Sequence, residues 1–208
     1  MDNTEEKTEK DFILIKAFLA GDNSEFDKLV LDYQNRIFNT CYRILGNYED
    51  ANDSAQDVFV SVFRSLKKFR FRSSFSTWIY RITINTCRNK LRSAGYRRRK
   101  KTVRLYTPGD CKEESLSMEI GDDRRTPEKE LARKEKTILI QNAIDSLPGL
   151  QKTVVVLRDI EGLTYEEIAS ITELNLGTVK SKIARARKIL QDKLSSLFME
   201  EKTTIFTK

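Results

Sequence analysis

Residues 164–188 constrain the fold of this chain more than any other stretch, because they read as two short helices joined by a tight turn. Thr164 is a good N-cap, and Glu167 follows it at the spacing of a capping box. Asn175 offers a second N-cap, and a basic, alanine-rich helix begins after it. The stretch therefore predicts a helix-turn-helix unit.

The second helix of this unit has two unlike faces. At about 100° per residue its apolar side chains share one narrow sector, which can pack on other helices. Hydroxyl and cationic side chains gather on another face. That face suits a recognition helix in the major groove of DNA, and a solvated basic helix at a domain end is the alternative. The apolar sector contains Val179, Ile183, Ala186 and Leu190, and the polar face contains Thr178, Lys180, Ser181, Lys182, Arg185, Arg187 and Lys188.

Composition limits the other functions open to the chain. Its 208 residues carry 38 Lys and Arg against 31 Asp and Glu, a net charge of +7 that weakly favours a polyanionic partner. Histidine is absent, which removes the commonest general base and the commonest metal ligand. No glycine-rich phosphate loop is visible, and Cys41, Cys87 and Cys111 are too far apart for a zinc pattern or a disulfide framework. We therefore expect reduced thiols, no cofactor and no metal site.

Helical periodicity extends over most of the chain and predicts an all-α fold of two small helical domains joined by a flexible linker. The spacing of apolar residues predicts helices over 11–19, 24–45, 47–69, 77–92, 127–146 and 148–162. Residues from about 99 to 127 lose this periodicity and contain Pro and Gly. The first ten residues are polar and are expected to fray. The predicted divisions are a first domain at 10–98, a linker at 99–127, a second domain at 128–196 and a tail at 197–208.

The helix after Asn47 begins with acidic residues, and two interpretations of them remain open. Asp50, Asp53 and Asp57 lie in its first turns with no basic residue among them. Acids are favourable at a helix N-terminus on their own account. They can also form an acidic, partly aromatic face that docks on a basic partner.

Aromatic and cationic residues alternate in the following segment, from Arg70 to Arg92. Such a mixture can bind single-stranded nucleic acid, where each stacked base contributes about 1–3 kcal/mol. Phe75 and Trp78 are, as the alternative, core residues. A dense basic run follows at 88–104, which is either a solvated tail or a segment that contacts phosphates.

Five sequence blocks in order carry a family resemblance: DANDSAQDVF (50–59), FSTWIYRITIN (75–85), LPGLQ (147–151), YEEIA (165–169) and GTVKSKIARAR (177–187). With them, the chain resembles the extracytoplasmic-function (ECF) group of bacterial sigma factors, within the sigma-70 family. The match covers about residues 10–95 and 128–195. The resemblance implies a subunit that binds core RNA polymerase and directs promoter-specific initiation of transcription, with no reaction of its own. The regulon would be one of stress or envelope response.

The resemblance also implies a role for each group of residues. The first domain is similar to sigma region 2, whose acidic helix binds the clamp of the largest polymerase subunit: Asp50, Asp53, Gln56, Asp57, Phe59 and Phe63. Its next loop and helix capture the opened strand of the minus-ten element: Arg70, Arg72, Ser73, Phe75, Trp78, Tyr80, Arg81, Asn85, Arg88, Asn89 and Arg92. The second domain is similar to region 4, which reads the minus-thirty-five duplex: Thr164, Asn175, Gly177, Thr178, Lys180, Ser181, Lys182, Arg185 and Arg187.

The implied partners are core RNA polymerase, through its clamp and flap regions, promoter DNA, and an anti-sigma factor of the kind that often regulates this group. We expect a cytoplasmic protein with no membrane insertion, because no apolar run approaches the ~20 residues of a membrane span.

Four positions depart from the family pattern. Glu173 occupies a turn position where Gly is frequent, and a positive φ there costs about 1 kcal/mol for a residue with a Cβ. Asn175 replaces Pro or Ser, and Asn89 replaces Asp. Lys182 replaces Arg and cannot make the same bidentate contact with guanine, so promoter preference is expected to differ there.

Two other functional classes compete with this interpretation. A stand-alone helix-turn-helix regulator would leave the acidic helix and the Trp78 segment without a role. A DNA recombinase or nuclease would need a nucleophile or clustered metal-binding carboxylates, for which Asp50, Asp53 and Asp57 are the only candidates.

Overall fold

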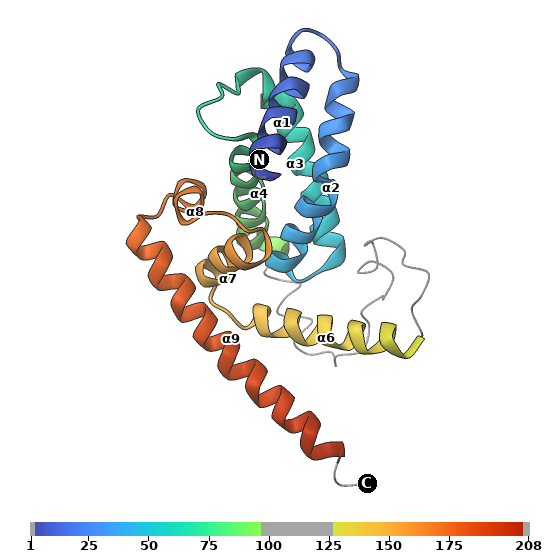
Figure 1. Ribbon diagram of the computed structural model, residues 1–208, viewed down its shortest axis with the longest axis vertical. Helices are drawn as coiled ribbons and strands as arrows, with labels where there is room; N and C mark the ends of the chain where they lie inside the picture. Colours follow the sequence, from blue (N-terminus) through green and yellow to red (C-terminus); the bar gives the residue numbers. More distant parts are fainter. Residues whose placement is uncertain (1–2, 97–126, 206–208) are drawn as a thin grey trace.

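The computed structural model of the chain describes residues 3–96 and 127–205, with side chains over 6–96 and 136–195. Every regular element within these two ranges is helical, which confirms the all-α prediction (Figure 1). Cys111 and nearly all of the predicted linker lie outside the described residues. None of the described helices combines the length and the apolar character that a membrane crossing requires.

The N-terminal half is a helical bundle. Its elements are α1 (Asn3–Leu19), α2 (Ser24–Leu45), α3 (Tyr48–Ser65), the short 3₁₀ helix η1 (Leu66–Lys68) and α4 (Phe75–Arg92). Asn47 caps α3 by accepting the backbone N–H of Asp50, and Ser74 caps α4 by accepting that of Thr77. The apolar stripe of α2 faces α1, α3 and α4, so the centre of the bundle is its shared core.

Helix α1 begins earlier than the sequence predicts, because side chains of its first turns are held by α2. The hydroxyl of Tyr33 donates a 2.5 Å hydrogen bond to Asp11, and Lys10 forms a 2.5 Å ion pair with Asp32. The Lys7 ammonium lies over the Tyr33 ring. These long-range contacts order a polar segment that local periodicity predicts to fray.

The C-terminal half contains the remaining helices. They are α6 (Pro127–Asp145), α7 (Gly149–Val155), the π-helical turn η3 (Val156–Ile160), α8 (Tyr165–Thr172) and α9 (Leu176–Ile205). Helix α9 continues to Ile205, which lies within the predicted tail at 197–208. Its last stretch contains no Gly or Pro that would end a helix.

The predicted helix-turn-helix is present as α8, a turn and α9, and its caps match the prediction. Thr164 and Glu167 form a reciprocal capping box at the start of α8. The Asn175 side chain accepts the backbone N–H of Thr178 at the start of α9. Glu173 has φ 60° and ψ 31°, which confirms that a residue with a Cβ occupies a left-handed position.

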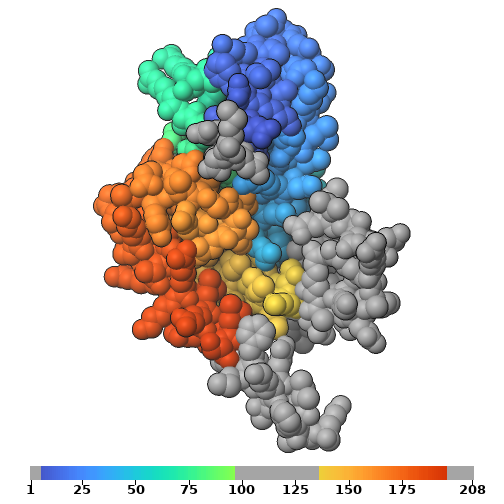
Figure 2. Space-filling view, in the orientation of Figure 1, coloured from blue at the N-terminus to red at the C-terminus, as the bar shows by residue number. Residues whose placement is uncertain are grey.

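The two halves pack against each other and share one apolar core. Val154, Leu157 and Leu163 of the C-terminal half belong to the same buried cluster as the bundle. Helix α6 crosses the C-terminal end of α2, and α8 lies beside α4 (Figure 1). The space-filling view shows the surface of α7 and α8 directly against the bundle (Figure 2). The described chain is therefore in a closed arrangement.

We predict that Glu173→Gly raises the free energy of unfolding by about 0.5–1 kcal/mol. Glycine accepts left-handed backbone without steric cost, although its more flexible unfolded chain cancels part of the gain. Thermal denaturation followed by circular dichroism should show a Tm increase of about 2–4 °C per kcal/mol. As a control, Glu166→Gly inside α8 should lower Tm, since Gly costs about 1 kcal/mol there. A Tm for Glu173→Gly at or below that of the unsubstituted chain would contradict the prediction.

Candidate nucleic-acid interface

One side of α3 presents an acidic surface that becomes apolar toward its C-terminal end. Asp53, Gln56 and Asp57 are exposed at successive helical turns, and Val60 and Phe63 follow, each about half exposed. Phe63 is steadied by edge-to-face contacts with Phe18 and Phe26 of α1 and α2. We name these five α3 residues the α3 face. Sequence reasoning missed Val60, although its spacing of four residues from Gln56 and three from Asp57 could have found it.

Two residues predicted for the same surface lie elsewhere. Asp50 is buried and forms an ion pair with Lys90 of α4, at 3.3 Å between Nζ and Oδ1. Phe59 is half-buried and packs against the core. Asp53 also pairs with Lys90, at 3.4 Å. Among the described side chains no group of three or more potential ligands is placed to hold a metal ion.

The loop before α4 exposes two arginines around a strained aromatic residue. Arg70 and Arg72 are exposed, and Phe71 between them has φ 54°, which is rare for a bulky side chain. Edge-to-face contacts with Phe12 and Phe69 hold the Phe71 ring, with centroids 5.0 and 4.9 Å away. Sequence reasoning missed Phe71, and no local pattern signals its conformation.

Phe75 and Tyr80 are buried in the bundle, which differs from the expectation that they face DNA. Phe75 is 3% exposed and packs on Tyr33 and Phe69, and Tyr80 is fully buried. Phe75, Ile79, Thr83 and Cys87 recur every four residues along α4, and this spacing is the signal that predicts burial. Trp78 is half-buried and tilts against Phe69, so only part of its ring is open.

The other predicted residues of this segment differ in how far their side chains are exposed to solvent. Helix α8 contacts Arg81, whose Nη2 donates a 2.7 Å hydrogen bond to Ser170. Ser73 is half-buried beside the cap of α4. The residues farther along α4 are exposed or half-exposed and form a polar and basic strip: Asn85, Arg88, Asn89 and Arg92.

The helix-turn-helix presents most of its predicted side chains to solvent. The apolar side of α9 is buried at Val179, Ile183 and Ala186. The exposed or half-exposed residues are Thr164, Asn175, Gly177, Thr178, Lys180, Ser181, Lys182, Arg185 and Arg187. Arg187 is held by Asp159 through two hydrogen bonds, from Nε at 3.1 Å and from Nη2. These bonds raise the pKa of the Arg187 guanidinium and direct it toward η3. Arg185 is therefore better placed than Arg187 to contact a phosphate or a base.

Two of the cysteines come together in the core although they are far apart in sequence. Cys41 and Cys87 are free, buried thiols with their Sγ atoms 3.6 Å apart. The hydrogen bond between the two thiols, together with burial, raises the pKa of the Cys41 thiol well above its ordinary value. A thiol held protonated is a poor nucleophile, which agrees with the predicted reduced, structural role.

Two family profiles match the chain, one in its N-terminal half and one in its C-terminal half. Residues 29–97 match the profile described as Sigma-70 region 2, and residues 137–190 match Sigma-70, region 4. The first span contains the α3 face and the α4 strip, and the second contains the helix-turn-helix.

Curated proteins and a solved structure show similarity over most of the chain. The RNA polymerase sigma-H factor of Pseudomonas aeruginosa is 36% identical over 196 residues, which cover 92% of this chain and 97% of that protein. The ECF RNA polymerase sigma-E factor of Haemophilus influenzae is 34% identical over 190 residues, covering 90% and 96%. The structure of CnrH in complex with the cytosolic domain of CnrY gives a TM-score of 0.61 at 25% identity, covering 90% and 98%.

We predict that Phe75→Ala lowers the free energy of unfolding by about 3–5 kcal/mol, because it leaves a cavity in the core. Urea denaturation should show the loss as a lower midpoint with little change in slope. The matched control is Arg70→Ala in the neighbouring loop, which is exposed and should change stability by less than about 0.5 kcal/mol. Equal stability of Phe75→Ala and Arg70→Ala would show that the Phe75 ring is not a core group.

Proposed function

This chain belongs to the sigma-70 family of RNA polymerase sigma factors, in its extracytoplasmic-function group, and from that membership we propose how its surfaces divide the work of initiation. As a sigma factor it directs promoter-dependent transcription initiation, and we propose a stress or envelope-response regulon for it. Its role requires selective binding, and no reacting group of its own.

The α3 face is the proposed contact with the clamp of core polymerase. One observation carries this proposal: acidic side chains lead into exposed apolar ones on a single helix side, while the neighbouring Asp50 is used internally. A patch with a charged edge and an apolar centre suits a protein partner, where buried aromatic anchors supply affinity and charges supply orientation. A stand-alone DNA-binding regulator would give this surface no task.

Two further surfaces are proposed to contact promoter DNA. The exposed strip of α4, with Arg70 and Arg72, would follow the opened strand of the minus-ten element, since cations and partly open rings suit single strands. The α9 face around Ser181, Lys182 and Arg185 would read the minus-thirty-five duplex. Flipping bases out of a duplex costs a few kcal/mol each, which binding to the first surface would offset.

We also propose a protein regulator and a cellular location. CnrH was solved in complex with the cytosolic domain of CnrY, and this chain is similar to CnrH over 90% of its length. A comparable partner, an anti-sigma factor, is therefore proposed for this chain. Cytoplasm is the proposed location because polymerase and promoter DNA are there. The second polymerase contact is proposed between the C-terminal half and the flap region.

We predict that Asp57→Ala combined with Phe63→Ala weakens binding to core RNA polymerase by about 10–100-fold, because it removes one charge and one exposed ring from the α3 face. Both side chains are exposed, so the fold should be retained. Fluorescence anisotropy with labelled chain and purified core polymerase measures the Kd. The matched control is Leu31→Ala with Lys28→Ala on α2, which should bind normally. Unchanged affinity of the α3 variant would remove the proposed clamp contact.

We predict that Arg185→Ala lowers promoter-dependent transcription by about 5–150-fold, because one base or phosphate contact contributes about 1–3 kcal/mol. Arg187→Ala should cost much less, since Asp159 already holds that guanidinium. Reconstituted holoenzyme on a single promoter template gives the rates, and polymerase affinity should be unchanged in both variants. Equal losses in the two variants would contradict the assigned geometry, and weaker polymerase binding by Arg185→Ala would contradict the assigned role.

A further inference from the structure

Glu161 of the C-terminal half inserts its carboxylate into the N-terminal bundle. It directly follows η3, and its side chain is 4% exposed. Thr40 Oγ1 donates a 2.7 Å hydrogen bond to Oε1, and Arg36 Nε donates a 3.3 Å bond to Oε2. The hydroxyl of Tyr80 also donates to Oε2. Thr40 and Arg36 belong to α2, and Tyr80 belongs to α4. They precede Glu161 in the sequence by 121, 125 and 81 residues, respectively, and together they surround its carboxylate.

This carboxylate site, made by Arg36, Thr40 and Tyr80, is matched to a negative charge. A buried carboxylate is stable only when it is paired and fully hydrogen-bonded. Burial, followed by the charge of Glu161, raises the pKa of Tyr80, so its hydroxyl remains a donor. Arg36 supplies the positive charge, and its Nη2 adds a 3.1 Å bond to the backbone carbonyl of Glu161. Neither half alone satisfies all of these groups.

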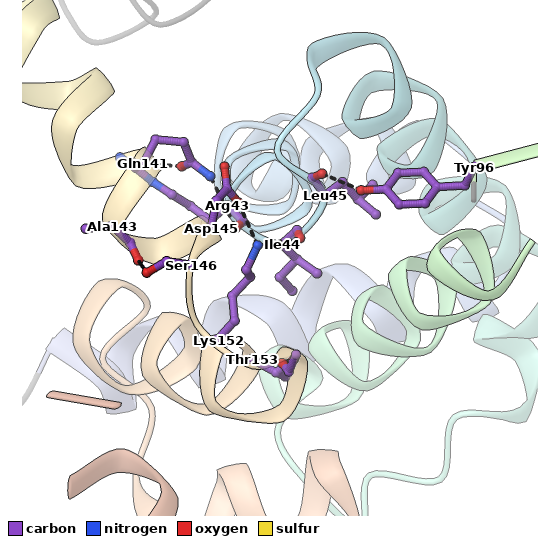
Figure 3. A network of polar contacts seen from close by, with 11 residues as sticks. Arg43, Ile44, Leu45, Tyr96, Gln141, Ala143, Asp145, Ser146, Lys152 and Thr153 are labelled. Carbon is purple, nitrogen blue, oxygen red and sulfur yellow. Dashed lines mark hydrogen bonds and ion pairs between the residues drawn. The ribbon is translucent and has the colours of Figure 1, made fainter. Parts of the chain in front are cut away.

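A second set of contacts closes the other end of the interface. Lys152 of α7 donates from Nζ to the carbonyl of Ile44, at 3.4 Å, and pairs with Asp145 at 2.6 Å. Gln141 of α6 donates to the carbonyl of Arg43, also at 3.4 Å. The carbonyl groups at the end of α2 therefore receive donors from the C-terminal half, and a cation lies at the negative end of the helix dipole (Figure 3).

The closed arrangement covers part of the α4 segment that the family resemblance assigns to the minus-ten strand. Thr77 of α4 donates a 3.1 Å hydrogen bond to Glu167 of α8, and Arg81 donates to Ser170. Thr77 is buried, and Nε of Arg81 is buried without a hydrogen-bond partner. Helix α8 belongs to the helix-turn-helix, so one DNA-binding unit lies on the other.

The promoter itself requires these two units to separate. Elements centred near minus ten and minus thirty-five are about 25 base pairs apart, or roughly 85 Å at about 3.4 Å per base pair. Helix α4 and helix α8 are in hydrogen-bond contact. The chain cannot engage both elements in this form, and opening it must break the bonds to Glu161.

We propose that the carboxylate site of the N-terminal half binds Glu161 as an intramolecular latch, which holds the free sigma factor in a closed, self-inhibited form. The proposal rests on the proposed function, because closure inhibits only a protein that must span two promoter elements. Polymerase binding then opens the chain, and the affinity observed for polymerase is reduced by the fraction of chains that are closed.

The test measures opening in the full chain by fluorescence energy transfer. Dyes are attached at Asp27→Cys in α2 and Lys188→Cys in α9, both exposed positions, with Cys111→Ser to remove a third reactive site. Cys41 and Cys87 are buried and stay in place. The variants are Glu161→Ala, Glu161→Gln and, from the other side of the latch, Thr40→Val. Glu166→Gln, an exposed acid on α8, is the matched control.

We expect transfer efficiency to fall in all three latch variants and to stay unchanged in the control. The apparent Kd for core polymerase should fall by about fivefold or more, within the usual range of coupling between sites. Combining Glu161→Ala with Thr40→Val should add little to Glu161→Ala alone, because both break the same contact.

Unchanged transfer efficiency in both Glu161→Ala and Thr40→Val would overturn the latch. Circular dichroism checks that helicity is retained, and if Glu161→Ala unfolds, the nearly isosteric Thr40→Val decides. Failure of the proposed function has a different signature. In that case neither the unsubstituted chain nor any variant binds core polymerase, while energy transfer still reports whether Glu161 controls opening.

Discussion

A buried carboxylate needs donors on every side, and the arrangement of the two halves follows from how Glu161 meets that requirement. Arg36, Thr40 and Tyr80 belong to the N-terminal bundle, whereas the acid belongs to the chain beyond the linker. Around this contact the apolar cores of the halves are continuous. Because hydrogen bonds to a buried charge are directional, they determine which surfaces of the two halves face each other. The apolar contacts around them then add buried area. Loss of the carboxylate would leave the buried Tyr80 hydroxyl without its acceptor and Arg36 without its charge partner.

The closed arrangement leaves the proposed DNA surfaces in different states. The α9 face and the α3 face are open, while Arg81 is covered by α8. A free chain in this form could meet polymerase through α3 first and release α8 afterwards. That order would restrict promoter binding to assembled holoenzyme. Weak DNA binding by the free protein is then a property of its fold as well as of its small recognition surface.

Local sequence signals were sufficient for the helices and their caps, and insufficient for contacts between distant segments. The Thr164–Glu167 box and the Asn175 cap acted as predicted, because capping depends on neighbours three residues away. Nothing near Glu161 in sequence shows that its partners lie more than 80 residues earlier. Burial of Phe75 was one of the two interpretations that the sequence left open, and the four-residue repeat of buried positions that starts there favours it. The early start of α1 depends on Tyr33, and no local pattern within α1 contains that information.

The central claim is that this chain gives core RNA polymerase its promoter specificity. The most direct measurement is transcription in vitro from fragmented genomic DNA of the host, with core polymerase in the presence and absence of the chain, followed by mapping of the RNA 5′ ends. The account predicts a small set of start sites that depend on the chain and share two sequence elements, about 10 and about 35 base pairs upstream. Start sites that are the same with and without the chain would contradict it.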